Sequence, residues 1–118
     1  MTKLCEQINS PGCDSSTSFN CNIELPSFYF EFGRYWFEVQ SKHYTEWATT
    51  ENDTNCRFRI EKDDSLDHWS LGLAFMQGWY TVHDYEDDRI GFVAHTDSTK
   101  ARPLCTTVEA CKFTTQTN

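Results

Sequence analysis

The chain has 118 residues, of which 15% are aromatic, and its formal net charge is −8 at pH 7. This length fits one domain whose core is built from large flat side chains. The acidic charge argues against nucleic acid and anionic membrane surfaces as partners, because both attract basic patches, and no apolar run is long enough to span a bilayer.

Residues 1–20 are polar and rich in Ser, Thr, Asn and Asp, and Pro11-Gly12 is a turn signal within them. Such a composition offers few apolar side chains for a core. We therefore expect an irregular N-terminal segment, which is tied down if Cys5 and Cys13 form a disulfide.

The next stretch alternates between two sets of side chains on both sides of Gly33-Arg34. Phe28, Phe30 and Phe32 occupy every second position before the glycine, and the alternation resumes over Tyr35–Val39. Period-two alternation around a glycine turn predicts a β-hairpin.

Residues 40–68 are predicted to form a short turn, a polar loop, a short strand and a charged connection. The polar loop Thr49–Asn55 contains Asn52-Asp53-Thr54, which fits the glycosylation sequon and would place Asn52 on the surface of a secreted protein. Such a triplet also arises by chance. Arg57–Ile60 is predicted as a short strand with Phe58 and Ile60 on one face, and the charged connection Glu61–His68 follows it.

The segment Trp69–Val93 carries two apolar runs around an acidic cluster. Trp79–His83 and Arg89–Val93 are predicted to form a second hairpin, with the turn at residues 84–88. Asp84 closes the first of these strands, and we expect it to make a turn hydrogen bond. Leu73–Gln77 has room for a short helical turn. The sequence thus indicates an all-β fold of antiparallel hairpins with short helical turns.

Six cysteines stand at positions 5, 13, 21, 56, 105 and 111, and no Cys-x-x-Cys pair occurs. This spacing disfavours zinc or thioredoxin-like chemistry and favours disulfides in an oxidising compartment. Cysteine spacing alone leaves the pairing open. The four histidines show no metal-ligand spacing, so we expect neither a metal nor a cofactor. The expected location is secreted or in the lumen of a lysosome or vacuole.

Two ordered sets of residues resemble the C-terminal lobe of a pepsin-like aspartic protease. The first is Leu25-Pro26-Ser27-Phe28-Tyr29-Phe30-Glu31-Phe32-Gly33; the second comprises Ser70-Leu71-Gly72, Ala74-Phe75, Trp79-Tyr80-Thr81-Val82-His83-Asp84 and Arg89-Ile90-Gly91-Phe92. The resemblance covers about residues 21–93. The simpler alternative is a set of amphipathic antiparallel hairpins with aromatic faces.

The resemblance implies roles for several residues that the composition alone does not assign. Cys21 would pair with Cys56, which leaves Cys5–Cys13 and Cys105–Cys111 as local pairs. Ile60 and Ser70 would lie nearest to a peptide substrate on the primed side of the cleft, although an ordinary core residue and an ordinary strand residue would look the same. Leu71 and Gly72 would support the catalytic loop without taking part in the chemistry.

The chain departs from the family where the chemistry is concerned. Aspartic proteolysis needs two carboxylates that share one proton, each from an Asp-Thr/Ser-Gly loop, and the chain has no such loop. Asp14-Ser15-Ser16, Asp53-Thr54-Asn55 and Asp97-Ser98-Thr99 all lack the glycine. Leu73 stands where the family usually has Asp. We therefore expect no catalytic residue in this chain.

Two functional hypotheses follow from these observations. In the first, the chain is a C-terminal segment of an aspartic endopeptidase, inactive alone, whose aspartate pair and remaining segments lie outside it and which binds peptide once completed. In the second, it is a non-catalytic binding or structural subunit of a larger assembly. The predicted divisions are a polar segment at 1–20, a pepsin-like β domain at 21–94, and a Ser/Thr-rich tail at 95–118 with a possible disulfide loop.

Overall fold

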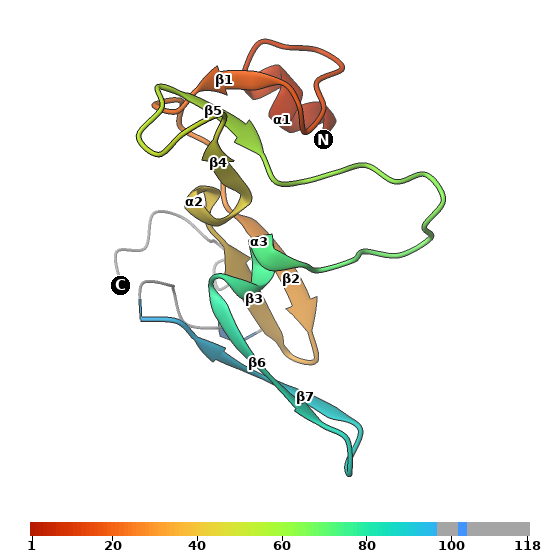
Figure 1. The fold of residues 1–118 in the computed structure, drawn as a ribbon. Helices are drawn as coiled ribbons and strands as arrows, with labels where there is room; N and C mark the ends of the chain where they lie inside the picture. The colour runs from red at the N-terminus through yellow and green to blue at the C-terminus, as the bar shows by residue number, and fades with distance from the viewer. Residues whose placement is uncertain (97–101, 104–118) are drawn as a thin grey trace.

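The computed structural model describes residues 1–96 and 102–103, and antiparallel strands account for most of its regular structure (Figure 1). The elements in chain order are α1 (Thr2–Gln7), β1 (Ser18–Asn20), β2 (Phe28–Phe32), β3 (Tyr35–Val39), α2 (Ser41–Tyr44), β4 (Thr45–Trp47), β5 (Asn55–Phe58), α3 (Leu73–Met76), β6 (Trp79–Asp84), β7 (Arg89–Ala94) and β8 (Arg102–Pro103). They form three sheets with strand orders β1-β5-β4, β2-β3-β8 and β6-β7. The all-β prediction is confirmed.

The N-terminal residues differ from the expected irregular segment. Helix α1 buries Leu4 and Cys5, and Ile8 is buried just beyond its end. Leu4 and Ile8 are four residues apart, so they lie on one face of the helical turn. Strand β1 pairs with β5 and buries Phe19. The expectation was wrong because a few well-spaced apolar side chains suffice when a disulfide, here Cys5–Cys13, holds the segment.

The first predicted hairpin is confirmed with the predicted strand limits. β2 and β3 pair from Phe28↔Val39 to Phe32↔Tyr35, which leaves Gly33-Arg34 as the turn. Gly33 has a φ of 58°, a left-handed conformation that glycine adopts without steric cost. Local alternation and turn chemistry therefore agree, which explains why this element could be read from the sequence.

The sheet β1-β5-β4 was predicted only in part. β5 spans Asn55–Phe58, shifted toward the N-terminus from the expected strand at 57–60, and β4 was not predicted. Cys56 is paired with Phe19 on one side and with Trp47 on the other, so β5 is the central strand. Its position follows from these long-range pairings, and the Cys21–Cys56 disulfide lies at the same point.

The second predicted hairpin is also confirmed and is one residue longer in each strand. β6 and β7 pair from Trp79↔Ala94 to Asp84↔Arg89. The predicted helical turn is present as α3, and it packs directly before β6. Figure 1 shows this hairpin projecting from one end of the molecule and the charged connection at 61–68 forming a long loop.

Aromatic rings join the two hairpins into one core. Phe92 of β7 stacks on Phe32 with ring centroids 5.3 Å apart, and it also lies 5.0 Å from Phe37. Trp79 is fully buried, and its indole N–H donates a hydrogen bond to the carbonyl oxygen of Glu38 at 2.9 Å. The hairpin β6–β7 is therefore attached to the β2–β3 sheet at its base.

A hydrogen bond and a ring contact from Tyr44 hold the start of β2. The hydroxyl of the buried residue Tyr44 donates a hydrogen bond to the carbonyl oxygen of Pro26, and the ring of Tyr44 lies 4.8 Å from that of Phe28. Burial raises the pKa of Tyr44 because the phenolate would lose its hydration. The short helix α2, which carries Tyr44, thus links the two three-stranded sheets.

Two pairings cross the divisions expected from the sequence. β1 belongs to the same sheet as β4 and β5, and β8 pairs with β3 through Tyr35↔Pro103 and Trp36↔Arg102. The domain boundaries at residues 20 and 94 stay predictions. Among the described residues, no helix combines the length and the apolar character that a membrane span requires.

Candidate functional site

The side chains of the β6–β7 hairpin divide into two faces because successive residues of a strand point to opposite sides. Trp79, Thr81, Phe92 and Ala94 lie on one face, and three of them are buried in or packed against the core. The opposite face is formed by Tyr80, Val82, Gly91 and Val93, which we call the outer hairpin face. The first face explains how the hairpin is held, and the second is open.

On the outer hairpin face, apolar side chains of a kind that is usually buried in a soluble protein are exposed to solvent. Tyr80 is 62% exposed, Val82 55% and Val93 58%. Tyr80 and Val93 are directly opposite each other in the register, so their side chains form one continuous patch. Large contiguous apolar surfaces mark sites of protein contact. This patch is therefore the candidate functional surface of the described chain.

Two glycines, Gly91 of the outer hairpin face and Gly72 before α3, have no steric reason within the described residues to lack a side chain. A methyl group at Gly91 would meet only Val82, at an ordinary distance of 3.6 Å from its Cβ, and one at Gly72 would meet nothing within 4 Å. Glycine inside a strand often marks a close approach of another backbone. The space around Gly72 is thus open to a segment outside the described residues.

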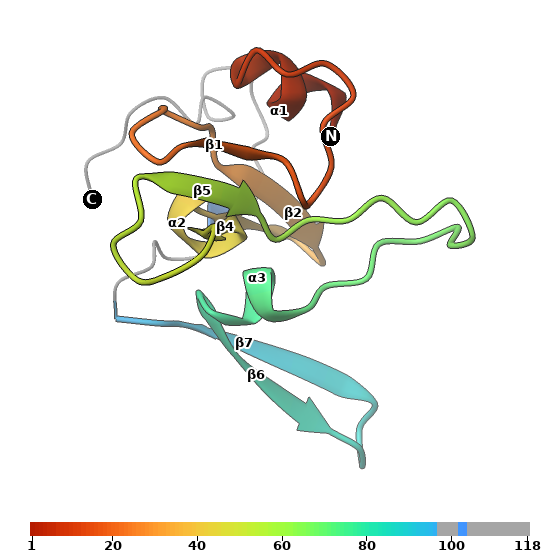
Figure 2. The same cartoon turned by 45° about the horizontal axis from the view of Figure 1, so that its top comes forward.

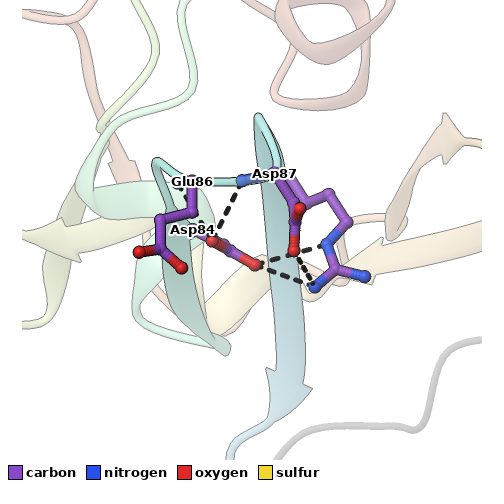
Figure 3. Close-up of polar contacts among 4 residues, drawn as sticks. Asp84, Glu86 and Asp87 are labelled. Atoms are coloured by element: carbon purple, nitrogen blue, oxygen red, sulfur yellow. Dashed lines mark hydrogen bonds and ion pairs between the residues drawn. The ribbon is translucent and has the colours of Figure 1, made fainter.

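The tip of the hairpin is closed by charged hydrogen bonds, and Figure 3 shows them. Arg89 donates to Asp84 at 2.8 Å and to Asp87 at 3.0 Å, and the backbone amides of Glu86 and Asp87 donate to Asp84 at 3.2 and 3.3 Å. The hydrogen bond from Arg89 is the main reason that the pKa of Asp84 is lowered. The expected turn hydrogen bond of Asp84 is confirmed.

Three further aspartates sit in the same kind of turn. Asp14 accepts hydrogen bonds from the hydroxyl of Ser16 at 2.6 Å and from its backbone amide at 2.9 Å, and these lower the pKa of Asp14. Hydrogen bonds also lower the pKa of Asp53, chiefly from Thr49, and of Asp63, chiefly from Ser65. A proton-sharing catalytic pair requires one carboxyl with a raised pKa. Among the described residues, every aspartate whose pKa is shifted has a lowered pKa.

The four positions assigned by resemblance fall into two groups. Ile60 and Leu71 are half-buried and pack against the core, whereas Ser70 and Gly72 are exposed. Ser70 lies outside the strands, which corrects its alternative interpretation as a strand residue. The cleft role of Ile60 and Ser70 and the supporting role of Leu71 and Gly72 stay predictions.

The remaining residue assignments are structural. The bridges Cys5–Cys13 and Cys21–Cys56 are present, as the resemblance implies, and Cys105 and Cys111 lie outside the described residues. In the part of the chain that the structure describes, no three His, Cys, Asp or Glu side chains come together as a metal site. Asn52 is exposed in the loop between β4 and β5.

The outer hairpin face was not identified from the sequence, although a signal for it existed. In β6, Tyr80 and Val82 alternate with Trp79 and Thr81, and in β7 Val93 lies between Phe92 and Ala94. Strands that are apolar on both faces are typical of strands covered on both faces. This pattern predicts a covering layer that the described residues do not provide.

The sequence of this chain matches known proteins over most of its length. The family model described as eukaryotic aspartyl protease matches residues 1–95. The chain is 32% identical to aspergillopepsin-1 of Aspergillus oryzae over 76 residues, and 30% identical to penicillopepsin-1 of Penicillium rubens over 76 residues. Each match covers 64% of this chain and 19% of the relative. The matched region thus spans about a fifth of the length of these curated relatives.

Proposed function

The chain belongs to the eukaryotic aspartyl protease family, and on this basis we propose that it is a structural segment of the C-terminal lobe of an aspartic endopeptidase. Its contribution is scaffold and cleft wall, and the two catalytic aspartates come from polypeptide outside this sequence. The proposal rests on the combination of family membership with a sequence that contains neither Asp-Thr-Gly nor Asp-Ser-Gly.

The outer hairpin face supports the part of the proposal in which further polypeptide completes the lobe. β6 and β7 pair only with each other among the described residues, and an isolated two-stranded sheet is marginally stable in water. Its apolar patch of Tyr80, Val82 and Val93 is exposed, and its edges can accept further strands. The relatives supply about four fifths of their length outside the matched region, which is ample polypeptide to cover this face.

The substrate is proposed to be a peptide, held only once the lobe is completed. Ile60 and Ser70 are then the residues of this chain nearest to it on the primed side. The polypeptide is proposed to reside in the secretory pathway, either secreted or in a lysosomal or vacuolar lumen. The two disulfides fit that oxidising environment.

An activity measurement tests the catalytic part of this proposal. The chain alone should not cleave a fluorogenic peptide at acid pH, because its sequence contains neither of the Asp-Thr/Ser-Gly loops that supply the proton-sharing aspartate pair. Combined with the segments that carry the two Asp-Thr/Ser-Gly loops, it should give cleavage that a transition-state mimic of aspartic proteases blocks. Inhibitable cleavage by the chain alone would contradict the proposal.

Matched variants of the hairpin test the docking part. Tyr80→Ser removes an aromatic ring from the outer hairpin face, whereas Tyr85→Ser removes one from the exposed turn at the tip. Tyr80→Ser should weaken assembly with the completing polypeptide by at least tenfold, a loss of about 1.4 kcal/mol, and Tyr85→Ser should leave it unchanged. Equal effects of the two variants would show that the outer hairpin face is not the contact.

The second hypothesis, a non-catalytic binding or structural subunit, is favoured by the same absence of Asp-Thr/Ser-Gly. It predicts a completing polypeptide that also lacks this motif. Identification of the polypeptide bound to the outer hairpin face therefore separates the two hypotheses.

A further inference from the structure

We infer that Asn52 carries an N-linked glycan. Asn52-Asp53-Thr54 is the one Asn-x-Ser/Thr triplet without an intervening proline in the sequence, and an asparagine in this triplet is the acceptor for N-glycosylation. The inference concerns a modification of the loop between β4 and β5, and it goes beyond the proposed part in an endopeptidase.

The acceptor side chain is presented to solvent at the loop. Asn52 is exposed and has a φ of 64°, a left-handed conformation that asparagine adopts more readily than most residues. Its carboxamide makes no hydrogen bond to any described residue. The acceptor nitrogen is therefore not committed to the fold, unlike the carboxylate of the neighbouring residue Asp53.

The middle residue of the triplet is turned back into the loop. One carboxylate oxygen of Asp53 accepts a hydrogen bond from the backbone amide of Asn55 at 3.1 Å, and the other accepts one from the hydroxyl of Thr49 at 2.6 Å. Because these bonds hold the Asp53 side chain, it does not cover Asn52. Thr54, whose hydroxyl completes the recognition triplet, is exposed.

The base of the loop is fixed, so its tip stays on the surface. The backbone amide of Ala48 donates to the carbonyl oxygen of Asn55 at 2.8 Å, and that of Cys21 donates to Thr54 at 3.0 Å. The Cys21–Cys56 disulfide closes the same region. In Figures 1 and 2 this loop and the tip of the β6–β7 hairpin lie at opposite ends of the molecule. A glycan on Asn52 therefore leaves the outer hairpin face free.

The reaction is a substitution at a sugar carbon. A bond forms between Nδ2 of Asn52 and the anomeric carbon of an oligosaccharide carried on a lipid pyrophosphate, and the bond from that carbon to the pyrophosphate oxygen breaks. The nitrogen loses one proton, and the lipid pyrophosphate departs as the leaving group. No change of oxidation state is required.

The test is secretion of the full chain from a eukaryotic host, followed by intact-mass measurement before and after amidase release of N-glycans. The parent should show a discrete mass excess that the amidase removes, with conversion of the Asn52 side chain to a carboxylate in the mapped peptide. Absence of this excess from secreted parent protein would overturn the inference.

Two pairs of variants locate the modification. Asn52→Asp should abolish the excess while it keeps a short polar side chain suited to the left-handed backbone. Thr54→Ala should also abolish it, whereas Thr54→Ser, which keeps the hydroxyl, should retain it. Persistence of the excess in Asn52→Asp, or its loss in Thr54→Ser, would overturn the assignment, and the Thr54 pair decides the question if Asn52→Asp is not secreted.

Discussion

Removal of the Cys21–Cys56 disulfide should destabilise the chain more than removal of Cys5–Cys13. The first bridge spans 35 residues and the second spans 8. On the chain-entropy model, the stabilisation grows with the logarithm of the loop length, which gives about 4 kcal/mol for the long loop and about 2.5 kcal/mol for the short one. The expected difference between the two double variants is therefore about 1 kcal/mol or slightly more.

The measurement is urea unfolding of Cys21→Ala/Cys56→Ala and of Cys5→Ala/Cys13→Ala, followed by tryptophan fluorescence without reductant. Alanine is the appropriate replacement because Cys5 and Cys56 are buried and a serine hydroxyl would be left without a partner there. Parent protein with reductant should lose at least as much stability as either variant. An equal or larger loss for Cys5→Ala/Cys13→Ala would refute the reasoning from loop length.

Two further substitutions test the hydrogen bonds that fasten the hairpins. Tyr44→Phe removes the donor to Pro26 and should cost about 0.5–1.5 kcal/mol in urea unfolding, the net value of one hydrogen bond, because Pro26 is exposed and water can replace the lost donor. Burial raises the pKa of Tyr44, so the parent should lose stability as the pH rises above about 10, and the variant should lose less. Asp84→Asn should reduce amide protection in β6–β7 at neutral pH, because it removes the carboxylate that pairs with Arg89. The difference between parent and variant should fade in acid, where the parent Asp84, whose pKa the Arg89 contact lowers, becomes protonated. A difference in protection that is the same in acid and at neutral pH would contradict the role of this ion pair.

Both hairpins were predictable because their information is local. Alternation of side chains around Gly33-Arg34 fixed the first, and an acidic turn between two apolar runs fixed the second. The register of each followed from its turn. The helical turn α3 was likewise predicted from the short apolar stretch beside it.

The N-terminal sheet was not predictable in the same way. α1 has too few apolar residues to show a helical pattern, and β1 contributes one buried side chain, Phe19. Their stability comes from pairing with β5 and from the disulfides. Cysteine spacing left the pairing open, and only the family resemblance pointed to Cys21–Cys56.

The sequence predicted the chemistry of the candidate site better than it predicted which surface is exposed. The lack of a catalytic aspartate loop could be read directly from the sequence, and the lowered pKa values of Asp14 and Asp53 agree with turn roles for these aspartates. The exposure of Tyr80, Val82 and Val93 required the structure. Sequence alternation shows which residues share a face, but only packing shows whether that face is covered.

Native mass spectrometry of the polypeptide recovered from its source, with and without reductant, tests the central claim most directly. The account predicts that this sequence is found joined to, or bound by, polypeptide that carries Asp-Thr-Gly or Asp-Ser-Gly, and that covers the outer hairpin face. Recovery of the chain alone, as a stable monomer with Tyr80 and Val82 open to solvent, would contradict it.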